Sequence, residues 1–228
     1  MTISFHHHMR NGDYVLNMVL EESASMGIKD LTVNASSIFD VHKPIIEHIK
    51  NGVVTGLECN YMGAEVGKAI SQGILEKPVI FRSHGGRAGD MENGSSKIDI
   101  AFLAAPCADN MGNCSGKYGP SACGSMGYAF SDAMHADKVV VLTDNLVPYP
   151  LKDTSIAEGY VDYVVEVDQI GDPKKIATGA AKPTTDMRKL MMADYCTQFV
   201  VNTPYFKDGF SYQTGVGGAS IASTISLA

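Results

Sequence analysis

Short apolar runs alternate with longer amphipathic segments along nearly the whole chain. The apolar runs are rich in β-branched residues and end at polar turns, and they predict seven strands: Thr2–Phe5, Leu31–Ala35, Val53–Asn60, Pro78–Ser83, Ile98–Ala105, Lys138–Thr143 and Tyr160–Val167. Several runs are apolar at successive positions, as in Val139–Leu142. This pattern is typical of strands that are buried on both faces of a parallel sheet.

Segments with helical spacing of apolar residues lie between these strands. They predict helices at Asp13–Met26, Pro44–Lys50, Ala64–Gln72, Ser125–Ala136 and Thr185–Asn202. Alternation of strands and helices with short polar connections predicts an α/β fold, in which helices cover both faces of an open, mainly parallel sheet.

The last twenty residues predict the opening of another structural unit. Gly209–Thr214 has the pattern of a strand and is followed by a Gly-rich turn and an apolar run that predicts a helix. We therefore expect a first domain over residues 1–208 and the beginning of a second over residues 209–228. The candidate hinges are Pro148–Asp153 and Gly171–Pro183.

Composition narrows the classes of protein that fit. Hydrophobic residues make up 45% of the 228 positions, which supports a packed core and excludes general disorder. The chain has 25 acidic and 18 basic residues, a formal charge of −7, and no basic cluster, so we expect no nucleic-acid partner. No apolar run reaches the roughly 18–20 residues that span a bilayer, and no secretory signal precedes the first strand. The five cysteines form no C-x-x-C pair, and a soluble protein of the reducing cytoplasm is expected.

Ligands of an open α/β sheet bind beyond the carboxyl ends of its strands. The loop after the first predicted strand contains His6, His7, His8 and Arg10, whose donors suit an anion pocket. A remnant purification tag and a solvated surface loop are the alternatives. A metal site is disfavoured, because adjacent histidines on one loop do not converge on a single ion.

A second donor-rich loop follows the fourth predicted strand and reads Arg82-Ser83-His84-Gly85-Gly86-Arg87. Gly85 and Gly86 let backbone N–H groups approach an anion, and the flanking side chains add donors. The alternative is a tight turn that needs glycine only for its geometry. We favour recognition of a carboxylate or phosphate, and we expect this loop to lie beside the first at the carboxyl edge of the sheet.

Three further segments have weaker signals. Asn110, Gly112 and Asn113 suit a loop that encloses a ligand chain, whereas no histidine lies beside the cysteines around them, which predicts small buried thiols. Thr143–Pro150 fits a binding loop and a Pro-stiffened crossover equally well. Gly215–Gly218 is not a dinucleotide-binding fingerprint, because no complete βαβ unit follows it.

Taken together, these segments resemble the citrate lyase alpha chains, a family of citrate:acyl-carrier-protein transferase subunits. The resemblance spans almost the whole chain and rests on TISFHHHMRNGDYVLNMV, PIIEHIKNGVVT, PVIFRSHGGR, IDIAFLAAP, GPSACGSMGYA, KVVVLTDNLVPYP, VDYVVEVDQIGDP and KDGFSYQTGVGGAS. It implies a coenzyme-A-transferase type of fold, related to that of sugar-phosphate isomerases. It also implies that acetate on a carrier thioester is exchanged for citrate, giving a citryl thioester and acetate.

The resemblance implies partners as well. These are citrate and acetate, an acyl carrier protein (the gamma subunit) with a prosthetic group derived from dephospho-coenzyme A, and a beta subunit that cleaves the citryl thioester. An oligomeric assembly is implied, and no cofactor is bound covalently to this chain, which acts on a thioester of coenzyme A or of the carrier. Family chains start before the position of Met1 and continue past Ala228. We therefore expect a first half and the opening of a second, with an active site between the halves.

Citrate is a trianion and requires several donors to replace its water. The residues expected to bind substrate are His6, His7, Arg10, Ser83, His84, Gly85, Gly86 and Arg87. Backbone donors for the thioester are expected at Asn110, Gly112, Asn113, Gly215, Gly217 and Gly218. The resemblance implies an anhydride between the two acids, so no covalent glutamate is assigned among Glu58, Glu65 and Glu92. The alternatives are another short-chain-acid coenzyme-A transferase, a sugar-phosphate isomerase, or an inactive fragment that serves only as an assembly domain.

Overall fold

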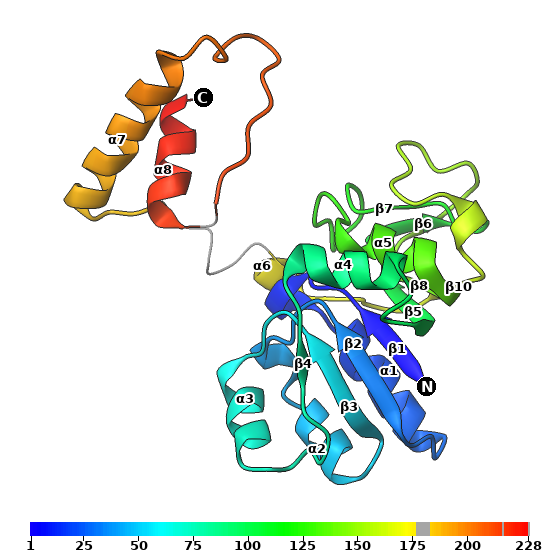
Figure 1. Cartoon of the computed structure of the whole chain (residues 1–228). Helices are drawn as coiled ribbons and strands as arrows, with labels where there is room; N and C mark the ends of the chain where they lie inside the picture. Colours follow the sequence, from blue (N-terminus) through cyan, green and yellow to red (C-terminus); the bar gives the residue numbers. More distant parts are fainter. Residues whose placement is uncertain (177–182, 216, 228) are drawn as a thin grey trace. The chain divides into compact units, whose positions relative to one another are not determined.

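The computed structural model describes residues 1–176, 183–215 and 217–227, which fall into two compact units (Figure 1). The first unit is Met1–Ile176, and the second comprises the described residues after it. The boundary lies inside the expected connection Gly171–Pro183, and not at residues 208 and 209. The reason is that helix α7 (Met187–Val201) packs along helix α8 (Gly218–Leu227), where the Oγ1 of Thr197 lies 3.2 Å from the Oγ of Ser223.

The first unit is built on a seven-stranded sheet in which all pairings are parallel. In spatial order the strands are β10 (Tyr163–Glu166), β8 (Ala136–Thr143), β5 (Ile98–Ala104), β1 (Thr2–Phe5), β2 (Leu31–Ala35), β3 (Val54–Cys59) and β4 (Ile80–Phe81). All seven strands were predicted, and the fold class is confirmed. The two edge strands, β4 and β10, are shorter than their apolar runs, because only one neighbour supplies hydrogen bonds to an edge strand.

Helices cover both faces of this sheet. Helices α1 (Val15–Ser25), α2 (Ile45–Lys50) and α3 (Ala64–Ser71) contribute Leu16, Ile45 and Val66 to one buried cluster. Helices α4 (His84–Glu92) and α5 (Tyr128–His135) contribute Met91 and Ala129 to a second. The remaining short helices of this unit are η1 (Arg10–Gly12), η2 (Asp40–His42), η3 (Glu158–Tyr160) and α6 (Pro173–Ile176).

A small second sheet joins strands that the apolar pattern did not predict. Its order is β7 (Cys114–Ser115), β6 (Cys107–Asp109) and β9 (Leu146–Val147). Strand β9 lies in the segment Thr143–Pro150, for which two interpretations were open, and Ala108 of β6 pairs with Leu146. The segment therefore has a structural role as a crossover that closes the small sheet.

In the second unit the expected strand at Gly209–Thr214 is not formed, whereas the helix after the Gly-rich turn is confirmed as α8. An extended segment becomes a strand only when a neighbour pairs with its N–H and C=O groups. The fifteen-residue helix α7 buries only Ala193. Among the described residues, none of the helices combines the length and apolar character needed to cross a membrane.

The order of strands defines where a ligand site belongs. The chain runs outward from β1 through β2 and β3 to β4, and then returns to place β5 on the other side of β1. The carboxyl ends of β1 and β5 thus form the topological switch point of the sheet, where open α/β sheets bind ligands. The histidine-rich loop begins there, directly after Phe5.

Candidate functional site

The loops after β1 and β4 meet at the carboxyl edge of the sheet, as we predicted. Strands β2 and β3 separate β1 from β4. Even so, the ring centroids of His7 and His84 lie only 5.6 Å apart, because helix α4 begins at His84 and returns over the sheet towards β5.

Tyr128, the first residue of α5, completes a cluster of three rings with His7 and His84, called the ring cluster below. Its ring lies 5.6 Å from His7 and 5.3 Å from His84. His84 is exposed, whereas His7 and Tyr128 are half-buried. The Nδ1 of His7 lies 2.6 Å from the Oγ of Ser36, which follows β2. The sequence patterns did not single out Tyr128, although it stands in the family-like stretch GPSACGSMGYA.

The histidines of this loop are neutral at pH 7. Burial, and then the neighbouring His84 and His8, lower the pKa of His7 to about 4. Burial is also the main cause that lowers the pKa of His6 and of His8. The histidines of this loop therefore offer neutral hydrogen-bonding imidazoles, and they are not cations.

His6 and His8 point away from the ring cluster into contacts with β5. Their rings stack with centroids 4.2 Å apart, and both hydrogen bond to the backbone of Ala104. The N–H of Ala104 donates to the Nε2 of His6 over 3.2 Å, and its carbonyl oxygen lies 2.8 Å from the Nε2 of His8. His6 is buried and ties the loop to the sheet, so the structure does not place it on the open surface with His84.

The expected Gly-Gly loop is the first turn of helix α4. Ser83 is its N-cap, and its Oγ accepts a hydrogen bond of 3.0 Å from the N–H of Gly86. Ser83, His84 and Gly85 are exposed. First-turn N–H groups have no acceptor within their helix, and the helix dipole makes this end favourable for an anion. The N–H of Gly85, which we predicted as a donor, thus lies in the first turn of a helix and not in a loop.

Arg87 lies in a different place from the one that we expected for an anion-binding side chain. It is 1% exposed, and its guanidinium forms a bidentate ion pair with the carboxylate of Asp132, at 2.6 and 3.0 Å. Its Nε donates to the Oδ1 of Asn34 over 2.7 Å. All of these hydrogen-bond acceptors lie inside the protein, so the guanidinium of Arg87 is not available for direct contact with a ligand. Arg10, in contrast, is half-buried and forms no ion pair with residues 1–176.

The three glutamates left unassigned lie outside the ring cluster. The Oε2 of Glu58 accepts from Asn34, Ser96 and Arg82, and its ion pair with Arg82 is largely buried. Glu65 pairs with Lys43 on the surface, and Glu92 is the exposed last residue of α4.

Of the backbone donors expected at Asn110, Gly112 and Asn113, those of Gly112 and Asn113 point inwards to Asp109, whereas Asn110 contributes its side-chain Oδ1 as the acceptor for the N–H of Tyr149. The Oδ1 of Asp109 accepts from the N–H groups of Met111, Gly112 and Asn113 over 3.0 to 3.1 Å. These donors are therefore occupied by a carboxylate of the protein itself. Gly215, Gly217 and Gly218 belong to the second unit, where the carbonyl of Gly217 accepts from Ile221 in the first turn of α8.

The cysteines of the first unit are poor nucleophiles. Cys59, Cys107 and Cys114 are buried, as predicted for the last two, whereas Cys123 is half-buried. Burial raises the pKa of Cys59 and Cys114 to about 12 and that of Cys123 to about 11. Within the part of the chain that the structure describes, no three side chains of His, Cys, Asp or Glu are grouped so that they could hold a metal ion.

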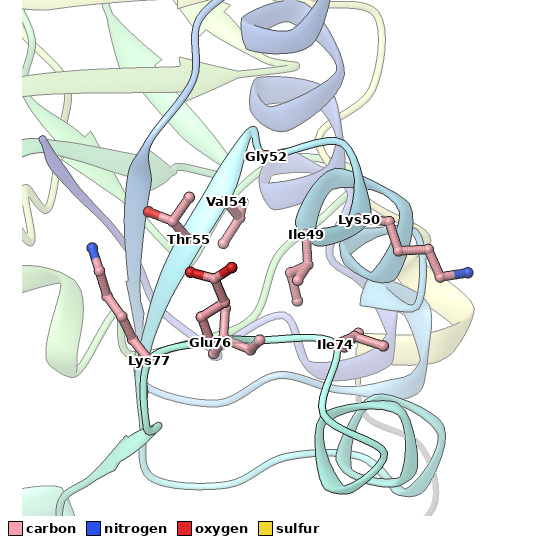
Figure 2. A pocket seen from close by; sticks show the side chains of 9 residues that line it. Ile49, Lys50, Gly52, Val54, Thr55, Ile74, Glu76 and Lys77 are labelled. Carbon is pink, nitrogen blue, oxygen red and sulfur yellow. The ribbon is translucent and has the colours of Figure 1, made fainter.

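A cavity of about 310 Å³ lies near the amino end of β3. Figure 2 shows the side chains that line it. Gly52 and Val54 lie at the amino end of β3, so this cavity is remote from the carboxyl edge. Its two lysines already have partners, since Lys50 lies 2.8 Å from Glu47 and Lys77 lies 3.8 Å from Asp30. We therefore assign no role to it.

Comparison with known proteins identifies close relatives. The model of the family described as citrate lyase, alpha subunit (CitF), matches residues 1–228. Citrate lyase alpha chains of Haemophilus influenzae and Escherichia coli are 51% and 47% identical over 224 residues, 98% of this chain. This chain spans only 45% and 44% of the length of these relatives.

Solved structures agree. One is a crystal structure of a protein from Streptococcus mutans, assigned as an alpha subunit of citrate lyase in complex with citrate. Its sequence is 54% identical to this chain, and its structure superimposes with a TM-score of 0.89. The match covers all of this chain and 44% of that one. A malonate decarboxylase alpha subunit of Acinetobacter baumannii matches 97% of this chain and 40% of its own, with 18% identity and a TM-score of 0.65. A 4-hydroxybutyrate CoA-transferase of Porphyromonas gingivalis matches all of this chain and 47% of its own, with 17% identity and a TM-score of 0.60. The last two similarities show a shared coenzyme-A-transferase type of fold.

Proposed function

This chain belongs to the citrate lyase alpha subunit family, and from that premise we propose that it binds citrate at the ring cluster and the first turn of α4. Within the complete protein it transfers the thioester of an acyl carrier protein, or of coenzyme A, from acetate to citrate. The products are a citryl thioester and free acetate.

The observation that carries this proposal is the convergence of donors at one edge of the sheet. His7, His84 and Tyr128 lie within 5.6 Å of one another, and the exposed Gly85 belongs to the same helical turn as His84. A tricarboxylate requires several hydrogen-bond donors spread over a few ångströms. Hydrogen bonds to an ionised carboxylate are stronger than those between neutral groups. The 54% identical relative solved with citrate supports the choice of ligand.

The proposed chemistry suits a site without a strong base. A citrate carboxylate attacks the carbonyl carbon of the acetyl thioester, and the thiolate leaves, which gives an anhydride of the two acids. The thiolate then attacks the citryl carbonyl carbon of that anhydride, and acetate leaves. No net proton transfer is required. Neutral imidazoles and backbone N–H groups can stabilise the oxyanions of both steps, and holding the reactants together can contribute roughly 7–11 kcal/mol.

The proposed partners follow from the family. The thioester is carried by a gamma subunit whose prosthetic group derives from dephospho-coenzyme A, and a beta subunit cleaves the citryl thioester. The assembly is oligomeric and cytoplasmic, and citrate fermentation is its metabolic setting. Because this chain spans about half of its relatives, turnover is proposed for the complete alpha chain.

Calorimetric titration with citrate tests the binding step. We expect the unaltered chain to bind citrate and His84→Ala to bind it at least tenfold more weakly, which corresponds to about 1.4 kcal/mol. His48→Ala, on helix α2 away from the carboxyl edge, is the control and should bind as the unaltered chain does. Equal affinity of the His84→Ala variant would remove His84 from the site. Transfer is measured with acetyl-carrier and labelled citrate in the complete complex, where label that stays in free citrate would contradict the reaction.

A further inference from the structure

The two helices that carry His84 and Tyr128 are weak by themselves. Three of the nine residues of α4 are glycines, and each costs about 1 kcal/mol relative to alanine inside a helix. Helix α5 starts after Gly127, at a φ of 49°, and has no side-chain N-cap. The geometry of this part of the surface therefore depends on contacts between elements, and α4 and α5 pack side by side (Figure 1).

The contact that joins these helices is the buried ion pair of Arg87 and Asp132. The side chains are 1% and 0% exposed. The Oδ2 of Asp132 also accepts from the Oγ of Ser4 on β1 over 3.0 Å. Besides the bond to the side chain of Asn34, the Nη2 of Arg87 donates to the carbonyls of Asn34 on β2 and Phe5 on β1, at 3.3 and 3.4 Å. One guanidinium thus connects both helices to the carboxyl ends of two central strands.

The residues of the ion pair lie one helical turn after the ring residues of the same two helices. His84 precedes Arg87 by three residues on α4, and Tyr128 precedes Asp132 by four residues on α5. Residues at these spacings lie on the same face of a helix, one turn apart. The ion pair is therefore one turn below the His84–Tyr128 contact. The third ring, that of His7, follows two residues after Phe5, whose carbonyl accepts from Arg87.

We propose that Arg87 and Asp132 are positioning residues, whose buried ion pair sets the spacing of His7, His84 and Tyr128 for citrate. This inference rests on the proposed function. Neither side chain touches the ligand, because both are enclosed. Stability alone does not explain the pair, since apolar residues of similar volume often replace a buried ion pair at no cost. The bidentate fork of an arginine fixes direction as well as distance, which an apolar contact does not.

The test combines an apolar replacement of the pair with imidazole NMR of the 228-residue chain. In the unaltered chain, citrate should shift the His84 signals, which are assigned by their loss in His84→Gln. The double variant Arg87→Met/Asp132→Leu leaves no buried charge unpaired and should fold. Its melting temperature should be lower than that of the unaltered chain, because the Oγ of Ser4 and the Oδ1 of Asn34 lose a buried partner. We expect its His84 signals to change without ligand and its Kd for citrate to rise at least tenfold. A double variant of the exposed pair, Lys97→Met/Asp137→Leu, is the control and should leave both readouts unchanged.

A second variant keeps the test decisive if the double variant does not fold. Arg87→Lys retains a charge opposite Asp132 and loses only the fork, so a folded protein with a several-fold higher Kd is expected. If the double variant or Arg87→Lys folds and keeps the Kd for citrate and the His84 signals of the unaltered chain, the positioning role is overturned, whereas the proposed citrate site is not. Absence of any citrate effect on His84 in the unaltered chain would overturn the proposed site, and the positioning role with it.

Discussion

The Nε2 of His42 lies 2.9 Å from the Oδ2 of Asp13, and both side chains are almost completely buried. The Nδ1 of the same imidazole accepts from the N–H of Phe39 over 3.0 Å, so the proton is on Nε2 and is donated to Asp13. The other carboxylate oxygen of Asp13 accepts from the N–H of Val15 at the start of α1. This contact joins the end of the histidine-rich loop to the turn after β2.

His42→Ala should therefore destabilise the first unit. It leaves the carboxylate of Asp13 buried without its side-chain donor, and leaving a buried charged acceptor without a partner costs about 3 kcal/mol or more. Urea unfolding of the variant measures the loss of stability, with His48→Ala, at a half-buried position on α2, as the control. A loss below about 0.5 kcal/mol, the usual effect of a surface substitution, would show that the pair contributes little.

The lowered pKa of His7 predicts a loss of stability in mild acid. The pKa of His7 is about 6.5 in the unfolded chain, whereas it is about 4 in the folded protein. The stability that this group provides is therefore complete above about pH 6.5 and is lost progressively as the pH falls to about 4. In His7→Gln, the free energy of unfolding should fall about 1–3 kcal/mol less between pH 7 and pH 4 than in the unaltered chain. Parallel curves for the two proteins would contradict this assignment.

The lowered pKa of Asp109 predicts a further loss of stability at a lower pH. Burial opposes its ionisation, but hydrogen bonds from the N–H of Leu151 and from Asn113 outweigh burial and lower its pKa. Its contribution is complete above the unfolded pKa of about 3.9 and is lost as the pH falls further. Asp109→Asn would place an amide NH₂ where Oδ2 accepts from Leu151 and Asn113. We expect this variant to lose about 2–4 kcal/mol of the free energy of unfolding at pH 7 and less below pH 4. Denaturant unfolding at both pH values measures the difference. A difference that does not vary with pH would rule out the charge as its source.

The thiols should differ sharply in their reactivity towards a disulfide reagent at pH 8. Cys196 is exposed, whereas Cys59, Cys107 and Cys114 are buried with raised pKa values. One thiol should react rapidly in the native chain, and all five should react after unfolding. Cys196→Ser should abolish the rapid phase. A rapid phase that persists in this variant would show that the half-buried Cys123 or one of the three buried thiols reacts in the native state.

Much of the fold could be predicted from local patterns. The seven parallel strands and helices α1, α2, α3 and α5 follow from apolar periodicity, which is a property of neighbouring residues, whereas the start of helix α4 was predicted as a loop. The prediction that the loops after β1 and β4 share one edge also holds, since the carboxyl ends of parallel strands point the same way. Strands β6, β7 and β9 were missed because they are only two or three residues long, too short for an apolar period.

The sequence by itself determined which donors stand at the carboxyl edge, but only the tertiary structure decided which of them face outwards. Arg87 and His84 are three residues apart in one predicted loop, yet Arg87 is buried and His84 is exposed. Their roles differ because Asp132 and Asn34, 45 and 53 residues away in the chain, supply the acceptors that hold the guanidinium inside. Likewise, His7 and Tyr128 become neighbours only when α5 packs beside α4. Burial and hydrogen-bond partners depend on residues distant in the chain, and no local pattern contains that information.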